Sequence, residues 1–263
     1  MSDAIPTTIE AEIGRALPVR KIDTADLIAA LNDGVRDFKL MPTYLVLLAL
    51  IYPIVGLIAA RASLGNGVLP LIFPLISGFA LVGPLAAVGL YELSRRRQAG
   101  LDTNWTHVFD VLKSKSIGTI VALGALLLVI FVSWLVVALQ LSNAILGGPV
   151  GNGIMSFLGT VLTTRTGWTL IVVGNAVGGM FAVITLMISA VSFPLALDRN
   201  VSFGTAVLTS IKAVTTNPVT MGLWGAIVAG ALVLGALPFF VGLAVVMPIL
   251  GHATWYLYKR VVV

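Results

Sequence analysis

The stretch SIGTIVALGALLLVIFVSWLVVALQ, from Ser116 to Gln140, decides the fold class of this protein. It contains no charged side chain, and the chain then stays free of charge as far as Thr164. About 20 consecutive apolar residues are enough for a helix to cross the hydrocarbon core of a bilayer. The stretch therefore predicts a membrane-spanning helix over about 116–140.

The composition of the whole chain agrees with this prediction. Charged residues make up 10% of the 263 residues and hydrophobic ones 58%, whereas about 25% charged residues are usual in a soluble domain. We predict an all-α polytopic membrane protein with six spans. They lie at about 42–60, 68–91, 116–140, 168–194, 218–236 and 239–258. Residues 1–21 are expected to form a flexible cytoplasmic tail, and residues 22–263 a single transmembrane domain.

The distribution of cations predicts the orientation of the chain. Fourteen of the 16 Lys and Arg residues fall in alternate segments between the six spans, and two fall in the others. Because cytoplasmic loops carry the excess of Lys and Arg, both termini are expected in the cytoplasm. The net charge of +5 then records topology, so we expect membrane lipids as partners and no nucleic acid.

The long run between the third and fourth spans leaves an apolar piece, Ile154–Leu162, outside both. Glycine-rich turns precede it. The sequence leaves open whether this piece is a surface helix or a re-entrant one.

Amphipathic segments precede the first, third and fifth spans and predict an internal repeat. Their apolar faces are Leu27, Leu31, Val35 and Phe38, then Trp105, Val108, Phe109 and Leu112, then Phe203, Val207 and Ile211. The unit of amphipathic helix plus two spans would occur three times in parallel. The apolar faces lie either in the headgroup boundary of the membrane or against the inner end of the bundle.

Prolines and ionisable residues near the inner ends of the even-numbered spans give the main candidate site. Pro84, Pro194 and Pro248 lie in those ends. One interpretation is a polar vestibule or partner-binding site open to the cytoplasm; the other is that the acids pair with arginines that set the orientation. His252 is either a protonatable group inside the bundle or a histidine bonded to a structural neighbour. The candidate residues are Glu92, Arg95, Asp198, Arg199 and His252.

Two further groups of residues have simpler interpretations. Gly174 and Gly178, with Asn175 between them, form a small-residue stripe that favours helix packing in the fourth span. Arg95, Arg96 and Arg97 form a basic triplet that either contacts lipid headgroups or fixes the orientation of the chain.

Enzyme signatures are missing from the sequence. There are no cysteines and two histidines, and no GxSxG, HExxH or phosphate-loop motif occurs. We therefore expect no catalytic residue, no metal and no cofactor.

The C-terminal motifs resemble a known family. They are FPLALDR (Phe193–Arg199) and GHATW (Gly251–Trp255), together with YELSRR (Tyr91–Arg96) earlier in the chain. From about residue 20 onward the chain resembles the bacterial integral membrane family called domain of unknown function 2189. Tyr256 stands where a second histidine would be expected in that family. The resemblance implies a bacterial inner-membrane protein and supplies no reaction.

These observations lead to one functional expectation with two alternatives. The expectation is a non-enzymatic scaffold or accessory subunit of a membrane complex or lipid process. The first alternative is a small-solute transporter or channel that uses the vestibule. The second is an enzyme that acts on a lipid.

Overall fold

The structure, a computed structural model, describes residues 14–41, 71–79, 81, 83–148, 154–238 and 240–263. Within these ranges the regular structure is helical, and the β contact is an isolated bridge between Val19 and Val262. The all-α prediction is confirmed for the described residues. The chain divides into two compact units: unit 1 comprises residues 1–45, 84–125 and 186–263, and unit 2 comprises 46–83 and 126–185.

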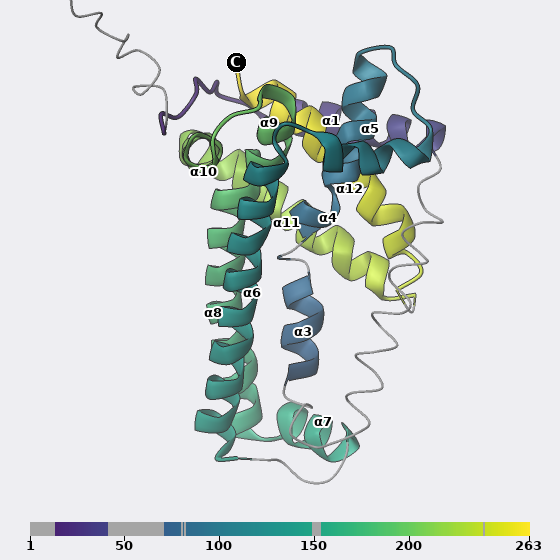
Figure 1. The fold of residues 1–263 in the computed structure, drawn as a ribbon. Helices are drawn as coiled ribbons and strands as arrows, with labels where there is room; N and C mark the ends of the chain where they lie inside the picture. The colour runs from purple at the N-terminus through teal and green to yellow at the C-terminus, as the bar shows by residue number, and fades with distance from the viewer. Residues whose placement is uncertain (1–13, 42–70, 80, 82, 149–153, 239) are drawn as a thin grey trace, which may run out of the picture. The chain divides into compact units, whose positions relative to one another are not determined.

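Unit 1 holds most of the short helices. They are α1 (Thr24–Leu40), α4 (Gly83–Ala86), α5 (Val88–Gln98), the 3-10 helix η3 (Trp105–Lys113), α9 (Ser192–Arg199), α10 (Phe203–Thr216), α11 (Pro218–Ala236) and α12 (Leu243–Val261). Unit 2 holds α3 (Ile72–Phe79), α7 (Ile154–Thr163) and most of α6 (Ile117–Leu146) and α8 (Arg165–Ser189) (Figure 1).

Three helical stretches of the described chain are long and apolar enough to cross a membrane. They are Ile117–Leu146, Arg165–Arg199 (α8 with α9) and Pro218–Ala236. They correspond to the spans predicted at 116–140, 168–194 and 218–236. The span expected at 42–60 lies outside the described residues, so the number of six and the threefold repeat stay predictions.

The span expected at 68–91 is interrupted. Its described part forms α3, α4 and α5, and α5 continues to Gln98. Helix α3 ends at Phe79, and Ala87 separates α4 from α5; Pro84 lies in the first turn of α4, where its missing backbone donor is tolerated. The extension of α5 past Tyr91 contains the arginine triplet, whose side chains find acidic partners described below.

The last helix also differs from the expected span at 239–258. Helix α12 begins at Leu243 and ends at Val261, and it is not among the stretches apolar enough to span by composition. Its C-terminal half carries polar and aromatic side chains that are buried in unit 1, including His252, Trp255 and Tyr258. Burial in the protein, rather than in lipid, accounts for this composition.

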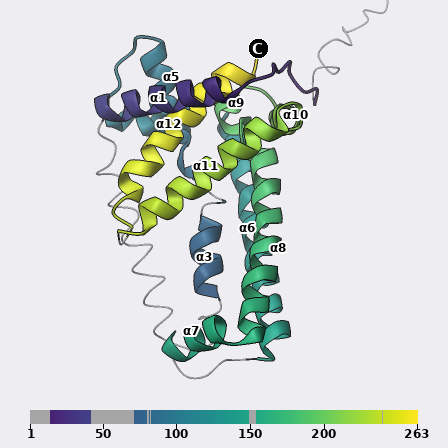
Figure 2. The same ribbon diagram turned by 180° about the vertical axis from the view of Figure 1, so that it is seen from behind.

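Helix α1 packs against α12 (Figure 2). Asp23 caps α1, and its capping box with Asp26 satisfies backbone donors of the first turn. The buried face is Leu27, Ala30, Gly34 and Asp37, so it is rotated from the expected Leu27, Leu31, Val35 and Phe38. Gly34 explains the rotation, because a Cβ there would lie 2.6 Å from the carbonyl oxygen of Ile249 and 2.7 Å from the amide nitrogen of Ala253. The small residue allows the two backbones to meet.

Part of the expected tail is held on unit 1. The amides of Gly14 and Leu17 donate to the hydroxyls of Thr205 and Thr209 in α10, at 3.2 and 2.9 Å. The amide of Arg20 donates to the carbonyl of Val261 at 2.9 Å. Residues 14–21 are therefore tied to α10 and α12, while the tail prediction for residues 1–13 lies outside the described residues.

Unit 2 has an apolar cluster around Trp134. Its indole donates to the carbonyl oxygen of Pro74 at 3.1 Å, and its ring lies 5.6 Å from that of Phe181. A Cβ at Gly178 would lie 3.1 Å from Trp134, so the glycine allows α8 to approach this side chain of α6 closely. Gly174 meets no described neighbour. Asn175 is exposed and donates to the carbonyl of Ile171 in its own helix at 2.8 Å.

The apolar piece between the third and fourth spans is helical, as α7. It exposes Met155, Leu158 and Leu162. The choice between a surface helix and a re-entrant one stays open.

Candidate functional site

Helix α5 places polar side chains at the centre of unit 1. It packs against α12, η3 and α9. Two glycines permit the close approach: a Cβ at Gly251 would lie 2.5 Å from Leu90 Cδ1, and one at Gly89 would lie 2.9 Å from Val108 Cβ. Within α5, Glu92 and Ser94 are buried. The chain thus brings an acid and a hydroxyl into the interior, where each needs a partner.

Asp37, Ser94, Arg97, His252 and Tyr256 form what we call the buried polar cluster. The Ser94 hydroxyl donates to Asp37 Oδ2 at 2.6 Å and contacts His252 Nδ1 at 2.8 Å. The Tyr256 hydroxyl donates to the same carboxylate at 3.0 Å. Arg97 forms an ion pair with Asp37. Asp37, Ser94 and His252 are 0% exposed, so the cluster is closed to solvent at its centre.

The buried polar cluster joins three helices by charge and hydrogen bonding. Asp37 comes from α1, Ser94 and Arg97 from α5, and His252 and Tyr256 from α12. Its carboxylate accepts from two hydroxyls and is neutralised by a guanidinium, which is what a buried carboxylate requires. The cluster therefore fixes α1 and α5 against α12.

The order of groups in the cluster differs from that of a serine hydrolase. A hydrolytic triad places the imidazole between the hydroxyl and the carboxylate. Here Ser94 stands between Asp37 and His252, and the imidazole Nδ1 lies 3.9 Å from the carboxylate. The other ring nitrogen, Nε2, is buried and has no hydrogen-bond partner among the described residues. A serine that bridges two buried groups is a structural link.

Glu92 and Asp198 each have a separate set of partners. Glu92 accepts a bidentate pair from Arg95, with both N···O distances 2.7 Å. Asp198 accepts from the Tyr258 hydroxyl at 2.6 Å and from Lys259 at 3.0 Å. The two candidate acids, Glu92 and Asp198, thus each pair with a cation within unit 1, and the polar vestibule stays a prediction.

The two remaining cations of the prediction are also engaged. Arg199 donates to the carbonyl of Val263 at 2.9 Å. Arg96 donates to the carbonyl of Asp102 at 2.7 Å and pairs with Asp110 at 3.4 Å. With Arg95 on Glu92 and Arg97 on Asp37, the whole triplet is held by the protein. Contact of the triplet with lipid headgroups stays a prediction.

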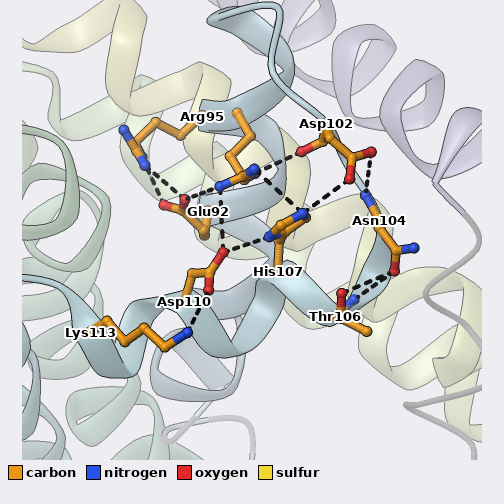
Figure 3. Close-up of polar contacts among 9 residues, drawn as sticks. Glu92, Arg95, Asp102, Asn104, Thr106, His107, Asp110 and Lys113 are labelled. Carbon is orange, nitrogen blue, oxygen red and sulfur yellow. Dashed lines mark hydrogen bonds and ion pairs between the residues drawn. The ribbon is translucent and has the colours of Figure 1, made fainter.

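His107 forms a second cluster in the turn after α5, with Asp102 and Asp110 (Figure 3). Its Nδ1 lies 2.6 Å from Asp110 Oδ2, and its Nε2 lies 3.1 Å from Asp102 Oδ2. Hydrogen bonding to Asp110 and then to Asp102 raises the pKa of His107. The same contacts lower the pKa of both carboxyl groups. The cluster links the turn before η3 to η3 itself.

We expect the segment 101–113 to loosen as the pH rises through the pKa of His107. The pKa is raised in the folded state, so its stabilising effect is complete below about pH 6.5 and lost above the folded value. The lowered pKa of Asp102 and Asp110 also stabilises the segment, but this stabilisation is lost as the pH falls through the pKa values of the two carboxyls in the folded state. Amide hydrogen exchange over 101–113, corrected for intrinsic rates, should show greatest protection between about pH 4 and pH 6.5.

The control for this prediction is H107Q, in which the rise in exchange above neutral pH should disappear. An unchanged pH profile in that variant would contradict the assignment of the effect to His107.

Sequence reasoning missed Asp37, Ser94 and Tyr256. One signal was present: Asp37 follows Leu27, Ala30 and Gly34 on a single face of α1, and an acid in line with a buried face indicates a buried partner. The partner itself was not readable, because Asp37 and Tyr256 are 219 residues apart. Among the described residues, no group of three or more His, Asp or Glu side chains is arranged to hold a metal ion.

Long apolar helices and a polar cluster sealed among short helices define an all-helical integral membrane protein. The model of the family described as "Predicted integral membrane protein (DUF2189)" matches residues 72–198, just under half of the chain. The resemblance found in the sequence is confirmed over that range, which includes α5 and η3. The GHATW motif lies beyond it. No curated protein and no solved structure matches the chain.

Proposed function

We propose that this chain is a non-enzymatic integral membrane protein that acts as a scaffold or accessory subunit of a membrane complex or lipid process. The observation that supports the proposal is the closure of the buried polar cluster. Within the fold the Asp37 carboxylate pairs with Arg97 and accepts from two hydroxyls, and His252 Nδ1 contacts Ser94; such contacts hold helices together. The part of unit 1 around the buried polar cluster would therefore act as a rigid support for a partner rather than as an open binding site.

The proposal includes a location and a set of partners. The asymmetry of Lys and Arg supports a cytoplasmic position for both termini, and the resemblance to the family implies a bacterial inner membrane. The partners would be membrane lipids and another membrane protein or complex, with no nucleic acid.

A small-solute transporter or channel is the alternative, favoured by Pro248 inside α12. Proline leaves the carbonyl of the preceding turn without its donor, and such carbonyls serve ion sites in transporters. However, Glu92 and His252 are 3% and 0% exposed. A vestibule that used them would first have to break the contacts with Arg95 and Ser94.

A lipid-acting enzyme has less support. A general base must reach its substrate within hydrogen-bonding distance. In the buried polar cluster the hydroxyl, carboxylate and imidazole are turned toward one another and are closed to a substrate.

The accessory role is tested by purification in mild detergent from native membranes at native expression. A second membrane protein should co-purify at fixed stoichiometry and should be lost in a variant that opens the cluster, such as S94V. Recovery of the chain alone would contradict the accessory role. Solute flux in proteoliposomes that depends on Glu92 would favour the transporter instead.

A further inference from the structure

The exposed side of η3 is an apolar feature of unit 1 that the proposed function leaves unused. Trp105, Phe109 and Leu112 are 50%, 55% and 68% exposed. The rings of Trp105 and Phe109 lie edge to face with centroids 6.5 Å apart. On the opposite side, Val111 is buried and Val108 packs against Gly89 of α5. The apolar edge thus points away from the described protein.

The three amphipathic segments of the sequence differ in this respect. Helix α1 turns its buried face to α12, and α10 buries Ala206, Ala213 and Val214. Helix η3 buries Val111 alone and exposes its two aromatic residues. Helix η3 therefore buries fewer of its residues than α1 and α10 do.

The position of η3 along the chain places it at a membrane boundary. It ends at Lys113, and the apolar stretch α6 begins at Ile117. Three linking residues span at most about 14 Å. Ser116 in this link donates to the carbonyl of Ala196, in the last turns of the second apolar stretch, at 2.5 Å. The start of α6 and the end of the second apolar stretch therefore both lie close to the link that follows η3.

The charges around η3 fit the surface of an anionic membrane. Asp102 and Asp110 contact His107 and Arg96. Lys113 Nζ lies 3.6 Å from Asp110 Oδ1, yet its side chain is 84% exposed, and Lys115 is also exposed. Cations beside exposed aromatic residues, at the end of a span, are the composition of a segment that lies in the headgroup region.

We propose that η3 is an interfacial anchor whose edge of Trp105, Phe109 and Leu112 lies in the headgroup–acyl boundary of an anionic lipid surface, with Lys113 and Lys115 on the phosphates. The His107 cluster holds η3 against α5 from the other side. The anchor fixes the turn that joins α5 to α6 at a defined depth in the membrane. This inference does not depend on the accessory role.

The absence of cysteine from the chain allows a direct test by spin labelling. Single variants F109C and L112C carry a nitroxide on the apolar edge, and A99C, on the exposed end of α5, is the matched control. The proteins are reconstituted in vesicles of phosphatidylethanolamine and phosphatidylglycerol. Collision rates are measured with oxygen, which concentrates in lipid, and with a water-soluble nickel chelate.

The ratio of oxygen to nickel collisions should be several-fold higher at 109 and 112 than at 99. Substituting both Lys113 and Lys115 by Gln should reduce the ratio at 109. Equal ratios at all three positions would overturn the proposal, because the edge would then lie in water. Low collision rates with both reagents at 109 and 112 would overturn it as well, since a protein partner or second copy would then cover the edge.

Discussion

Replacing Arg97 by methionine is expected to destabilise the protein by about 3 kcal/mol, because it leaves the carboxylate of Asp37 buried without its counter-charge. Breaking a buried pair from one side costs about 3–5 kcal/mol, and the lower end applies because Arg97 keeps 27% of its side chain exposed. Asp37 itself is 0% exposed. Hydrogen bonds from the hydroxyls of Ser94 and Tyr256 reduce the loss of stability, but the charge on the Asp37 carboxylate remains.

The free energy of unfolding in mixed micelles, followed by circular dichroism, measures this effect. R36M is the matched control: Arg36 is 70% exposed and lies 3.9 Å from Asp33, so its loss should cost less than about 0.5 kcal/mol. The double variant D37N/R97M should recover much of the stability lost in R97M, because no uncompensated charge is left inside. If the destabilising effects of D37N and R97M instead add in the double variant, the ion pair between Arg97 and Asp37 does not hold α1 and α5 together.

The second large effect is expected at Gly34. The atoms that a Cβ would meet are the carbonyl oxygen of Ile249, the amide nitrogen of Ala253 and the Cβ of Ala253, all within 2.8 Å. Two of the three are backbone atoms, so the helices must separate. G34A is expected to cost about 1–3 kcal/mol, although alanine favours a helix over glycine by about 1 kcal/mol. G34V should detach α1 and expose Asp37 to water.

Limited proteolysis and hydrogen exchange over residues 24–40 report the detachment. The matched control is G222A in α11, where a Cβ would meet no described atom within 4 Å; this substitution should be neutral or slightly stabilising. Protection of α1 in G34V equal to that of the unsubstituted protein would show that the contact with α12 does not hold α1.

The long apolar helices were predictable from sequence because their signals are local. Helix α11 runs from Pro218 to Ala236 as expected, since proline marks its start and another proline follows its end. Helix α6 was found from its charge-free run, although it extends six residues further. A charge-free run indicates that a helix is surrounded by lipid, because the bilayer interior tolerates almost no ionic side chain.

The short helices around α5 were not predictable in the same way, because their composition reflects long-range contacts. The C-terminal half of α12 is too polar for a typical membrane span, and its contacts with α1 and α5 explain this composition. The sequence singled out His252, Glu92 and Asp198, with a shared vestibule as one interpretation and structural partners as the other. The partners of these three residues were not predictable, because a bidentate arginine or a tyrosine hydroxyl cannot be assigned from sequence spacing alone.

The accessibility of position 94 tests the closed polar cluster most directly. S94C keeps the size of the serine side chain and introduces a single thiol into a chain that has none. In sealed membranes, a membrane-impermeant methanethiosulfonate should leave this thiol unmodified from either side, while A99C on the exposed end of α5 reacts from the side that it faces; unfolding in detergent should make both react. Rapid modification of S94C in the folded protein would contradict the account, because water would then reach the groups that we place in a sealed structural cluster.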